Sequence, residues 1–265
     1  MKPKLVVTGA AGRMGKRVLN AAVESGEFEI AAATEADGNP TLGKDAGLTA
    51  GIGELGVPIT TEGPADADVV IDFSLPQATD KVIDYCVQNN VALILATTGL
   101  SDEQLKKVDE VSAKIPIIQQ TNMSVGMNTL FAVVGKVANM LGEEYDIEIT
   151  EAHHRFKRDA PSGSAMTLAE NVAKETGRDF PDCLVHGRYG KEAVREKGTI
   201  GMHAIRGGDI TGEHSVIYSS LGETITISHS AHNRDNFARG SVRAAKWLAG
   251  KPAGRYSMAD ALGIK

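Results

Sequence analysis

Over the first 120 residues, short apolar runs alternate with amphipathic stretches. Each apolar run is too continuous for a half-exposed strand and has the length of a strand buried on both faces. We therefore expect strands at residues 4–8, 30–34, 69–73, 91–98 and 115–120. Between them, apolar residues recur with helical spacing, which predicts helices at residues 13–25, 78–89 and 101–114. Such alternation is typical of an α/β fold with a doubly wound parallel sheet.

The pattern changes after residue 125. Helices are expected at residues 127–141 and 164–175, with an alternating strand at 145–154 between them. Three further strands are expected at 199–206, 214–220 and 224–231, the last two joined by a tight turn at Leu221-Gly222-Glu223. Helices combined with consecutive strands predict an α+β domain with a mostly antiparallel sheet.

The last strong helical pattern, at residues 237–248, is expected to return to the first domain, because a lone terminal helix must bury its apolar side. This predicts a dinucleotide-binding domain at residues 1–124, completed by 236–265. A substrate-binding and oligomerisation domain is expected at 125–235. The two chain crossings, near 121–126 and 231–236, are candidate hinges.

Composition removes several classes of function. The 265 residues include 28 Lys and Arg against 34 Asp and Glu, so the net charge of −6 gives no broad positive surface for nucleic acid. No apolar run reaches the length of a membrane span, and the sequence begins without a signal-peptide pattern, so we expect a cytoplasmic protein. Two cysteines, Cys86 and Cys183, cannot form a disulfide scaffold or a four-cysteine zinc site.

A glycine-rich turn, Gly9-Ala10-Ala11-Gly12-Arg13-Met14-Gly15, joins the first expected strand to the first helix. Small residues there let a pyrophosphate approach the backbone, and the start of the helix favours an anion. The alternative is an ordinary tight turn, since Ala11 stands where G-x-G-x-x-G has its second glycine. Glu35 ends the second strand 20 residues after Gly15, where an acid accepts hydrogen bonds from the adenosine ribose. Together these features predict a Rossmann-type dinucleotide site.

The same acid bears on the choice of cofactor. The Glu35 carboxylate would repel a 2′-phosphate, and Ala36 offers no guanidinium to hold one. We therefore expect NADH to be preferred, with NADPH possible because Arg13 and Lys16 lie close by in the sequence.

Basic and histidine residues are concentrated in residues 151–165, EAHHRFKRDAPSGSA. Positive charge followed by Ser162-Gly163-Ser164 at a helix start suggests a site for a small anionic substrate. Three alternatives are open: a metal held by the histidine pair, a solvated basic loop, or serines that only cap the helix. Metal binding is disfavoured because neighbouring residues of a strand point to opposite faces.

This segment closely resembles the signature of the dihydrodipicolinate reductase family, and the resemblance extends over essentially the whole chain. It includes GAAGRMG at 9–15, DFSLP at 72–76, ATTG at 96–99, NMSVGMN at 122–128 and GTIGMHAIRGGDITGEH at 198–214. The resemblance implies NAD(P)H-dependent reduction of 4-hydroxy-tetrahydrodipicolinate to tetrahydrodipicolinate, with loss of water, in diaminopimelate and lysine biosynthesis. It also implies a homotetramer. From the charge and the apolar runs we expect neither nucleic acid nor a membrane as partner, and we expect no metal.

Matching positions carry over the family's residue roles. His153 is then the proton donor or acceptor and Lys157 a second proton donor; His154 contacts substrate, and Gly163 with Ser164 binds a carboxylate. The implied cofactor-contacting residues are Gly9, Ala10, Ala11, Gly12, Arg13, Met14, Glu35, Ala96, Thr97, Thr98, Gln120, Thr121, Asn122 and Met123.

The chain departs from the family pattern at several positions. Ala36 and Leu75 stand where arginine occurs in family members, which bears on NADPH use. Met123 replaces a frequent phenylalanine, Phe156 a frequent histidine, and Ser164 the usual threonine.

Two rival functions deserve comparison. Another two-domain NAD-dependent dehydrogenase would share the first half of the chain but would not need the segment 151–165. A nucleotide sensor would need an interaction surface and no proton donors. Of the other histidines, His203, His214 and His229 fall in expected strands, where ordinary hydrogen-bonded roles are the simplest interpretation.

Overall fold

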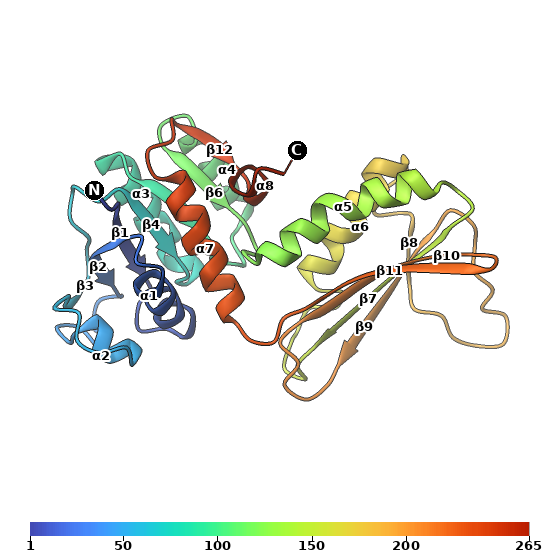
Figure 1. The fold of residues 1–265 in the computed structure, drawn as a ribbon, viewed down its shortest axis with the longest axis horizontal. Coiled ribbons are helices and arrows are strands. Elements are labelled where there is room, and N and C mark those ends of the chain that lie inside the picture. The colour runs from blue at the N-terminus through green and yellow to red at the C-terminus, as the bar shows by residue number, and fades with distance from the viewer. Residues whose placement is uncertain (265) are drawn as a thin grey trace. The chain divides into compact units, whose positions relative to one another are not determined.

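The computed structural model describes residues 1–264 and separates the chain into two compact units. One unit contains Met1–Val125 and Arg234–Lys265, and the other contains Gly126–Asn233 (Figure 1). These bounds lie one and two residues from the expected ones.

The first unit is built on a seven-stranded sheet in the order β12-β6-β5-β4-β1-β2-β3, and every ladder in it is parallel. The strands are β1 (Lys4–Thr8), β2 (Glu29–Thr34), β3 (Ile59–Thr60), β4 (Val69–Asp72), β5 (Ala92–Leu95), β6 (Pro116–Gln119) and β12 (Gly254–Tyr256). All residues of β4 and β5 are buried, as their continuous apolar runs indicate. The expected doubly wound parallel sheet is thus confirmed.

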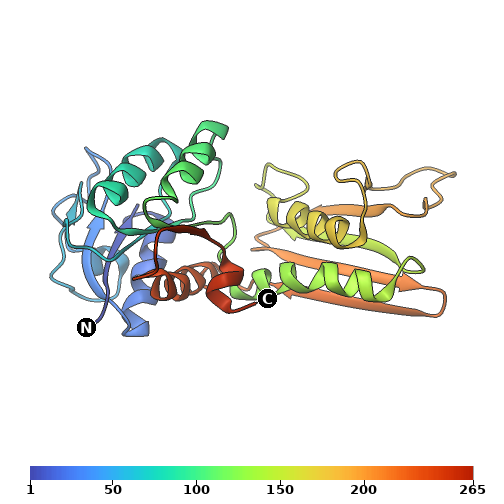
Figure 2. The same ribbon diagram turned by 90° about the horizontal axis from the view of Figure 1, so that it is seen from above.

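Helices cover both faces of this sheet. They are α1 (Arg13–Ser25), α2 (Ala46–Ala50), α3 (Thr79–Asn89) after a 3₁₀ turn η1 (Pro76–Ala78), α4 (Asp102–Val111), α7 (Asp235–Leu248) and α8 (Met258–Leu262). Side chains of β1 alternate between two cores: Leu5 and Val7 pack with α1, α7 and α8, whereas Val6 faces the core of α3 and α4. Figure 2 shows α3 and α4 on the side of the sheet opposite α7. Cys86 belongs to the α3–α4 core, and burial raises the pKa of its thiol, so it has no nucleophilic character.

The second unit places two helices on one face of a five-stranded sheet (Figure 1). Its elements are α5 (Val125–Leu141), β7 (Asp146–His153), α6 (Gly163–Thr176), β8 (Leu184–His186), β9 (Ile200–Arg206), β10 (Glu213–Ser220) and β11 (Glu223–Ser230). Ile147 and Ile149 of β7 point toward the helices, and the Tyr218 hydroxyl donates to the carbonyl oxygen of Val134 in α5 at 2.7 Å.

The α+β class is confirmed, but the sheet is mixed rather than mostly antiparallel. Its order is β11-β10-β7-β9-β8, with β10 antiparallel to β7 and β11, and β9 parallel to β7 and β8. The earlier strand β7 lies between β9 and β10, so consecutive strands in the sequence are not all neighbours. Two pairs of consecutive strands are neighbours: β8 and β9 are parallel, and β10 and β11 form a hairpin through a two-residue turn in which Gly222 has a φ of 106°.

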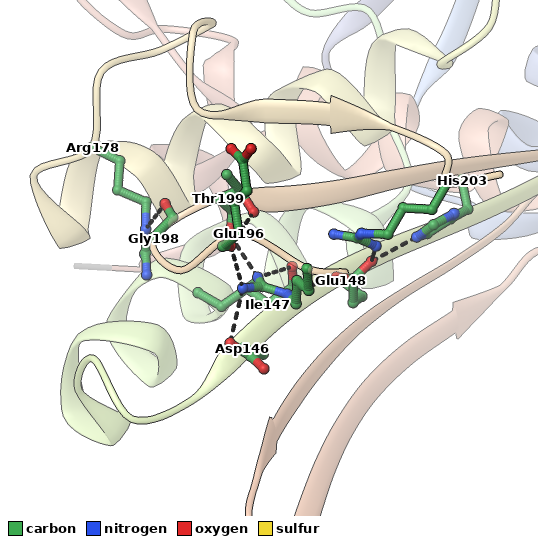
Figure 3. A network of polar contacts seen from close by, with 10 residues as sticks. Asp146, Ile147, Glu148, Arg178, Glu196, Gly198, Thr199 and His203 are labelled. Atoms are coloured by element: carbon green, nitrogen blue, oxygen red, sulfur yellow. Dashed lines mark hydrogen bonds and ion pairs between the residues drawn. The ribbon is translucent and has the colours of Figure 1, made fainter. Parts of the chain in front are cut away.

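The face of this sheet opposite the helices carries a network of ion pairs centred on Glu148 (Figure 3). Arg188 and Arg195 donate to its carboxylate at 2.9 and 3.0 Å, and His203 Nε2 lies 2.6 Å from it. Arg195 also reaches Asp146 at 2.8 Å. Burial opposes ionisation of Glu148, but these hydrogen bonds outweigh it and lower the pKa of the carboxyl to about 2.

The dependence of unfolding on acid pH should show how much the Glu148 ion pairs stabilise the fold. A carboxyl with a lowered pKa stabilises the fold above its unfolded value, and this contribution is lost as pH falls from about 4.5 toward about 2. We expect urea midpoints of wild type and Glu148→Gln to differ at pH 6 and to converge as pH falls through that window. A difference that stays constant down to pH 2.5 would contradict the assignment.

Candidate active site

The glycine-rich turn is fastened to the end of β2. The amides of Gly9 and Ala10 both donate to the carbonyl oxygen of Thr34, at 2.9 and 3.1 Å, and Gly9 has a φ of 70°. Gly12 is the N-cap of α1 and offers no side chain to the first turn of the helix. The start of α1 is therefore open to an anion, as a pyrophosphate site requires.

Gly15 lets the helix approach the turn closely. A Cβ atom there would overlap the carbonyl oxygen of Gly9 and lie 2.6 Å from Cα of Ala10. Any side chain would therefore displace backbone atoms of the turn. Gly15 performs the packing role of the third glycine in a dinucleotide-binding turn.

Glu35 lies beside this turn, although 24 residues separate it from Ala11 in the sequence. Its Oε1 accepts the Ala11 amide at 2.8 Å, and its Oε2 accepts the Asn39 side-chain amide at 3.1 Å. The carboxylate is thus held at the edge of the turn, the place where an acid contacts an adenosine ribose in such folds.

Further cofactor candidates follow the carboxyl ends of β5 and β6. They are Ala96, Thr97 and Thr98 after β5, and Gln120, Thr121, Asn122 and Met123 after β6. Parallel strands bring these ends to the same edge of the sheet as the glycine turn, which is where open α/β sheets bind ligands. The residues present therefore fit a dinucleotide.

A buried carboxyl, which the sequence did not single out, organises that edge. Asp72 at the end of β4 is fully buried; its Oδ2 accepts the Thr97 hydroxyl at 2.7 Å and its Oδ1 accepts the Ser74 amide at 3.1 Å. Burial raises the pKa of this carboxyl. Asp72 thus ties the cofactor candidate Thr97 to the neighbouring strand.

In the second unit, the C-terminal end of β7 presents a histidine held by a buried acid. His153 Nδ1 lies 2.6 Å from Oε2 of Glu151, whose side chain is 1% exposed. Arg206 of β9 donates to both carboxylate oxygens, at 2.8 and 2.7 Å. The Ser162 amide adds a fourth contact at 3.0 Å.

The surroundings lower the pKa of both Glu151 and His153. Burial opposes the charge of Glu151, but Arg206 and His153 outweigh it and hold the pKa of the carboxyl below its usual range. Burial lowers the pKa of His153, and the positive charges of Lys157 and Arg206 lower it further. Glu151 acts in the opposite direction, but its effect is smaller than these together.

A second histidine, His214 of β10, belongs to this cluster. Its ring centroid lies 5.2 Å from that of His153, and its Nε2 lies 3.1 Å from the Ser162 hydroxyl. Burial, followed by the charge of His153, lowers the pKa of His214 to about 3, so the ring is neutral at pH 7. The interpretation of His214 as an ordinary strand residue therefore missed its place beside His153. Nothing in the spacing of the two residues indicates it.

Lys157 and the start of α6 enclose a carboxylate position. Lys157 Nζ lies 2.9 Å from Oδ1 of Asp159. Burial opposes ionisation of Asp159, but the hydrogen bond and charge of Lys157, together with the amide of Gly163, outweigh it and lower the pKa of this carboxyl. Ser162 caps α6, its hydroxyl accepting the Ala165 amide at 3.2 Å. These groups can therefore bind an anion.

The remaining substrate candidates are Ser164 and His154. Ser164 is the second residue of α6, directly after Gly163. His154 follows β7, its ring 6.3 Å from that of the exposed Phe156. Among residues 1–264, three or more His, Cys, Asp or Glu side chains do not gather anywhere as a metal site would require.

The fold and these sites define a class: an oxidoreductase with a nicotinamide-nucleotide unit of Rossmann type and an α+β unit in which a histidine is paired with a buried acid. Two family models match the chain, "Dihydrodipicolinate reductase, N-terminus" over residues 3–123 and "Dihydrodipicolinate reductase, C-terminus" over 126–262. The chain belongs to the dihydrodipicolinate reductase family.

Individual relatives agree with this assignment. The 4-hydroxy-tetrahydrodipicolinate reductase of Alkalilimnicola ehrlichii is 45% identical over 267 residues, covering 100% of both chains. That of Acinetobacter baumannii is 44% identical, over 99% of this chain and 97% of its own. A solved dihydrodipicolinate reductase from Paenisporosarcina sp. TG-14, bound to dipicolinate, has a TM-score of 0.71 over 97% of this chain and 98% of its own, at 21% identity, and supports the fold. No helix within residues 1–264 has both the length and the apolar character to cross a membrane.

Proposed function

We propose that His153 and Lys157 supply the proton chemistry of the family's reaction in this chain. That reaction is the reduction of 4-hydroxy-tetrahydrodipicolinate to tetrahydrodipicolinate, with loss of water, in diaminopimelate and lysine biosynthesis, and the chain is an oxidoreductase of this kind. One observation carries the assignment of roles: the imidazole of His153 lies beside an anion position formed by Lys157 and the start of α6.

The nucleotide, when bound, supplies the hydride, and the chain supplies binding and proton transfer. Lys157, the Gly163 amide and Ser164 bind a carboxylate of the substrate, at the position that the Asp159 side chain occupies between Lys157 and Gly163. His154 contacts the same substrate. His153 exchanges a proton near neutral pH, which imidazoles do more readily than other side chains.

A direct assay tests the reaction. Substrate is prepared freshly from pyruvate and aspartate semialdehyde, and NADH oxidation is followed by its absorbance. Oxidation is expected only when both precursors have been converted. Turnover of a simple semialdehyde acid in its place would favour the rival dehydrogenase, and tight NADH binding without turnover would favour a nucleotide sensor.

We also propose that the fourteen cofactor candidates named above bind the dinucleotide and that NADH is preferred over NADPH. The support is the fixed position of Glu35, whose two oxygens accept hydrogen bonds from Ala11 and Asn39 and cannot easily turn away from a 2′-phosphate. Ala36, next to it, adds no positive charge.

Steady-state kinetics with both cofactors check this preference. We expect kcat/KM to favour NADH by about tenfold, equivalent to ~1.4 kcal/mol. Ala36→Arg should narrow the NADH-to-NADPH ratio by adding a guanidinium, whereas Ala36→Gln, which adds a polar side chain without charge, should leave it unchanged. An NADPH preference in wild type would overturn the proposal.

A homotetramer in the cytoplasm completes the proposed function. Its support is the face of the five-stranded sheet opposite α5 and α6, where β11 is largely exposed within one chain. Sedimentation equilibrium should give about four times the mass of the 27.9 kDa chain.

A further inference from the structure

We propose that Glu151, clamped by Arg206 and the Ser162 amide, is a positioning residue that determines which nitrogen of His153 exchanges the proton. The proposal rests on the role given to His153 above. It concerns the ring's tautomer and orientation, because Glu151 reaches the reacting atoms only through the histidine.

The contacts of Glu151 determine that its side chain is an ionised carboxylate. An ionised carboxylate has about four acceptor sites and no donor. Arg206 uses two of them, the Ser162 amide a third and His153 Nδ1 the fourth. The guanidinium and the backbone N–H can only donate, so Glu151 accepts from both. Arg206 and His153 hold the pKa of this carboxyl below its usual range against burial, so it remains ionised.

The tautomer of His153 follows from this. A nitrogen 2.6 Å from an ionised acceptor must itself carry the hydrogen, so the neutral ring is protonated at Nδ1. Nε2 is then the atom that takes up or releases the catalytic proton. Gly212 leaves room beside Nε2, because a Cβ atom at position 212 would lie only 3.1 Å from this nitrogen.

Arg206 connects this arrangement to the anion position. Besides gripping Glu151, its Nη2 donates to the backbone carbonyl oxygen of Asp159 at 2.6 Å. Asp159 lies two residues after Lys157 and contacts it. The Glu151–Arg206 pair thus fixes both the imidazole and the segment that binds the carboxylate, so it determines their mutual geometry.

Glu151→Gln is the main test. The glutamine oxygen would accept from Arg206 Nη2 and Ser162. Its NH₂ group would face His153 and favour protonation at Nε2 instead, and would lose the hydrogen bond from Arg206 Nη1. We expect kcat to fall about 10- to 100-fold, with KM for NADH unchanged. Glu151→Asp, which keeps the charge, should recover part of the loss.

Glu148→Gln is the matched control. Glu148 is also an arginine-paired glutamate of β7, but it lies on the opposite face of the sheet and contacts His203 rather than His153. Its kcat should stay within about twofold of wild type, at a temperature where circular dichroism shows both variants folded and sedimentation gives both the wild-type mass. An equal loss in the two variants would show a general effect on the sheet and overturn the proposal.

The pH profile provides a readout that a purely structural role would not move. The charged and titratable groups facing His153 are Glu151, Lys157, Arg206 and His214. Of these, only Glu151 stabilises the protonated ring, so its neutralisation should shift the His153 limb of kcat/KM to lower pH. An unshifted limb would count against the proposal.

Nitrogen-15 NMR of the wild-type enzyme decides the tautomer without any variant of Glu151. With the His153 signals assigned by their loss in His153→Ala, the neutral ring should carry its proton on Nδ1. Protonation at Nε2 would overturn the proposal even if Glu151→Gln failed to fold. If the wild type proved inactive toward the proposed substrate, the proposed function would be wrong. The NMR measurement would still test whether Glu151 determines the tautomer of His153.

Discussion

Replacing His153 with alanine is expected to lower kcat by about 10²- to 10⁴-fold, the usual contribution of a positioned acid or base. The fold should survive, because Glu151 keeps its three contacts with Arg206 and the Ser162 amide. Loss should appear mainly in kcat, since Lys157 and the start of α6 still bind the anion. Stopped-flow absorbance of NADH measures it under saturating substrate.

A histidine elsewhere in the same sheet serves as control. His203 of β9 also contacts a glutamate, Glu148, but on the other face of the sheet. His203→Ala should retain activity within about twofold, with sedimentation showing that it keeps the wild-type mass. Lys157→Ala should resemble His153→Ala in lowering kcat strongly, and should additionally raise KM for the substrate. Near-wild-type turnover in either His153→Ala or Lys157→Ala would remove that residue from the proton chemistry.

The pH dependence of kcat/KM provides a second check on the role of His153. Burial lowers the pKa of His153 from 6.5. The protonated form is therefore lost as pH rises through a value below 6.5, and the corresponding limb of kcat/KM should lie there. This limb should disappear in His153→Ala. A limb that persists unchanged must be assigned to another group.

Gly15→Ala is expected both to destabilise the nucleotide unit and to weaken the binding of NADH. The new Cβ would overlap the carbonyl oxygen of Gly9 and crowd Ala10, and both are backbone atoms of the turn. The turn and the start of α1 must separate, at a cost of about 1–3 kcal/mol in unfolding free energy. Affinity for NADH should fall about tenfold or more, because the anion site is formed by that contact.

Thermal unfolding with and without NADH separates the two effects. The variant should melt at lower temperature and gain less stability from added NADH than wild type does. Asn20→Ala, a partly exposed position of the same helix, is the control and should change neither quantity appreciably. Wild-type NADH affinity in Gly15→Ala would show that the close approach is not needed for binding.

Local patterns were sufficient for much of the molecule. The apolar runs specify strands buried on both faces, since only a covered parallel sheet can shelter such strands from water. The spacing of Gly15 and Glu35 placed an acid at the glycine turn, and the structure brings Glu35 to Ala11. The elements that the patterns missed, among them β3, β12 and α8, have two to five residues and are too short to show any periodicity.

The sequence by itself therefore determined the doubly wound sheet, the glycine turn with its acid, and the segment containing His153 and Lys157, because each depends on neighbours along the chain. Only the tertiary structure decided that β7 lies between β9 and β10, and hence that Arg206 and His214 meet Glu151 and His153. Strand order depends on backbone hydrogen bonds between distant segments, and these bonds are the same for every side chain. No local pattern of residues can therefore reveal it.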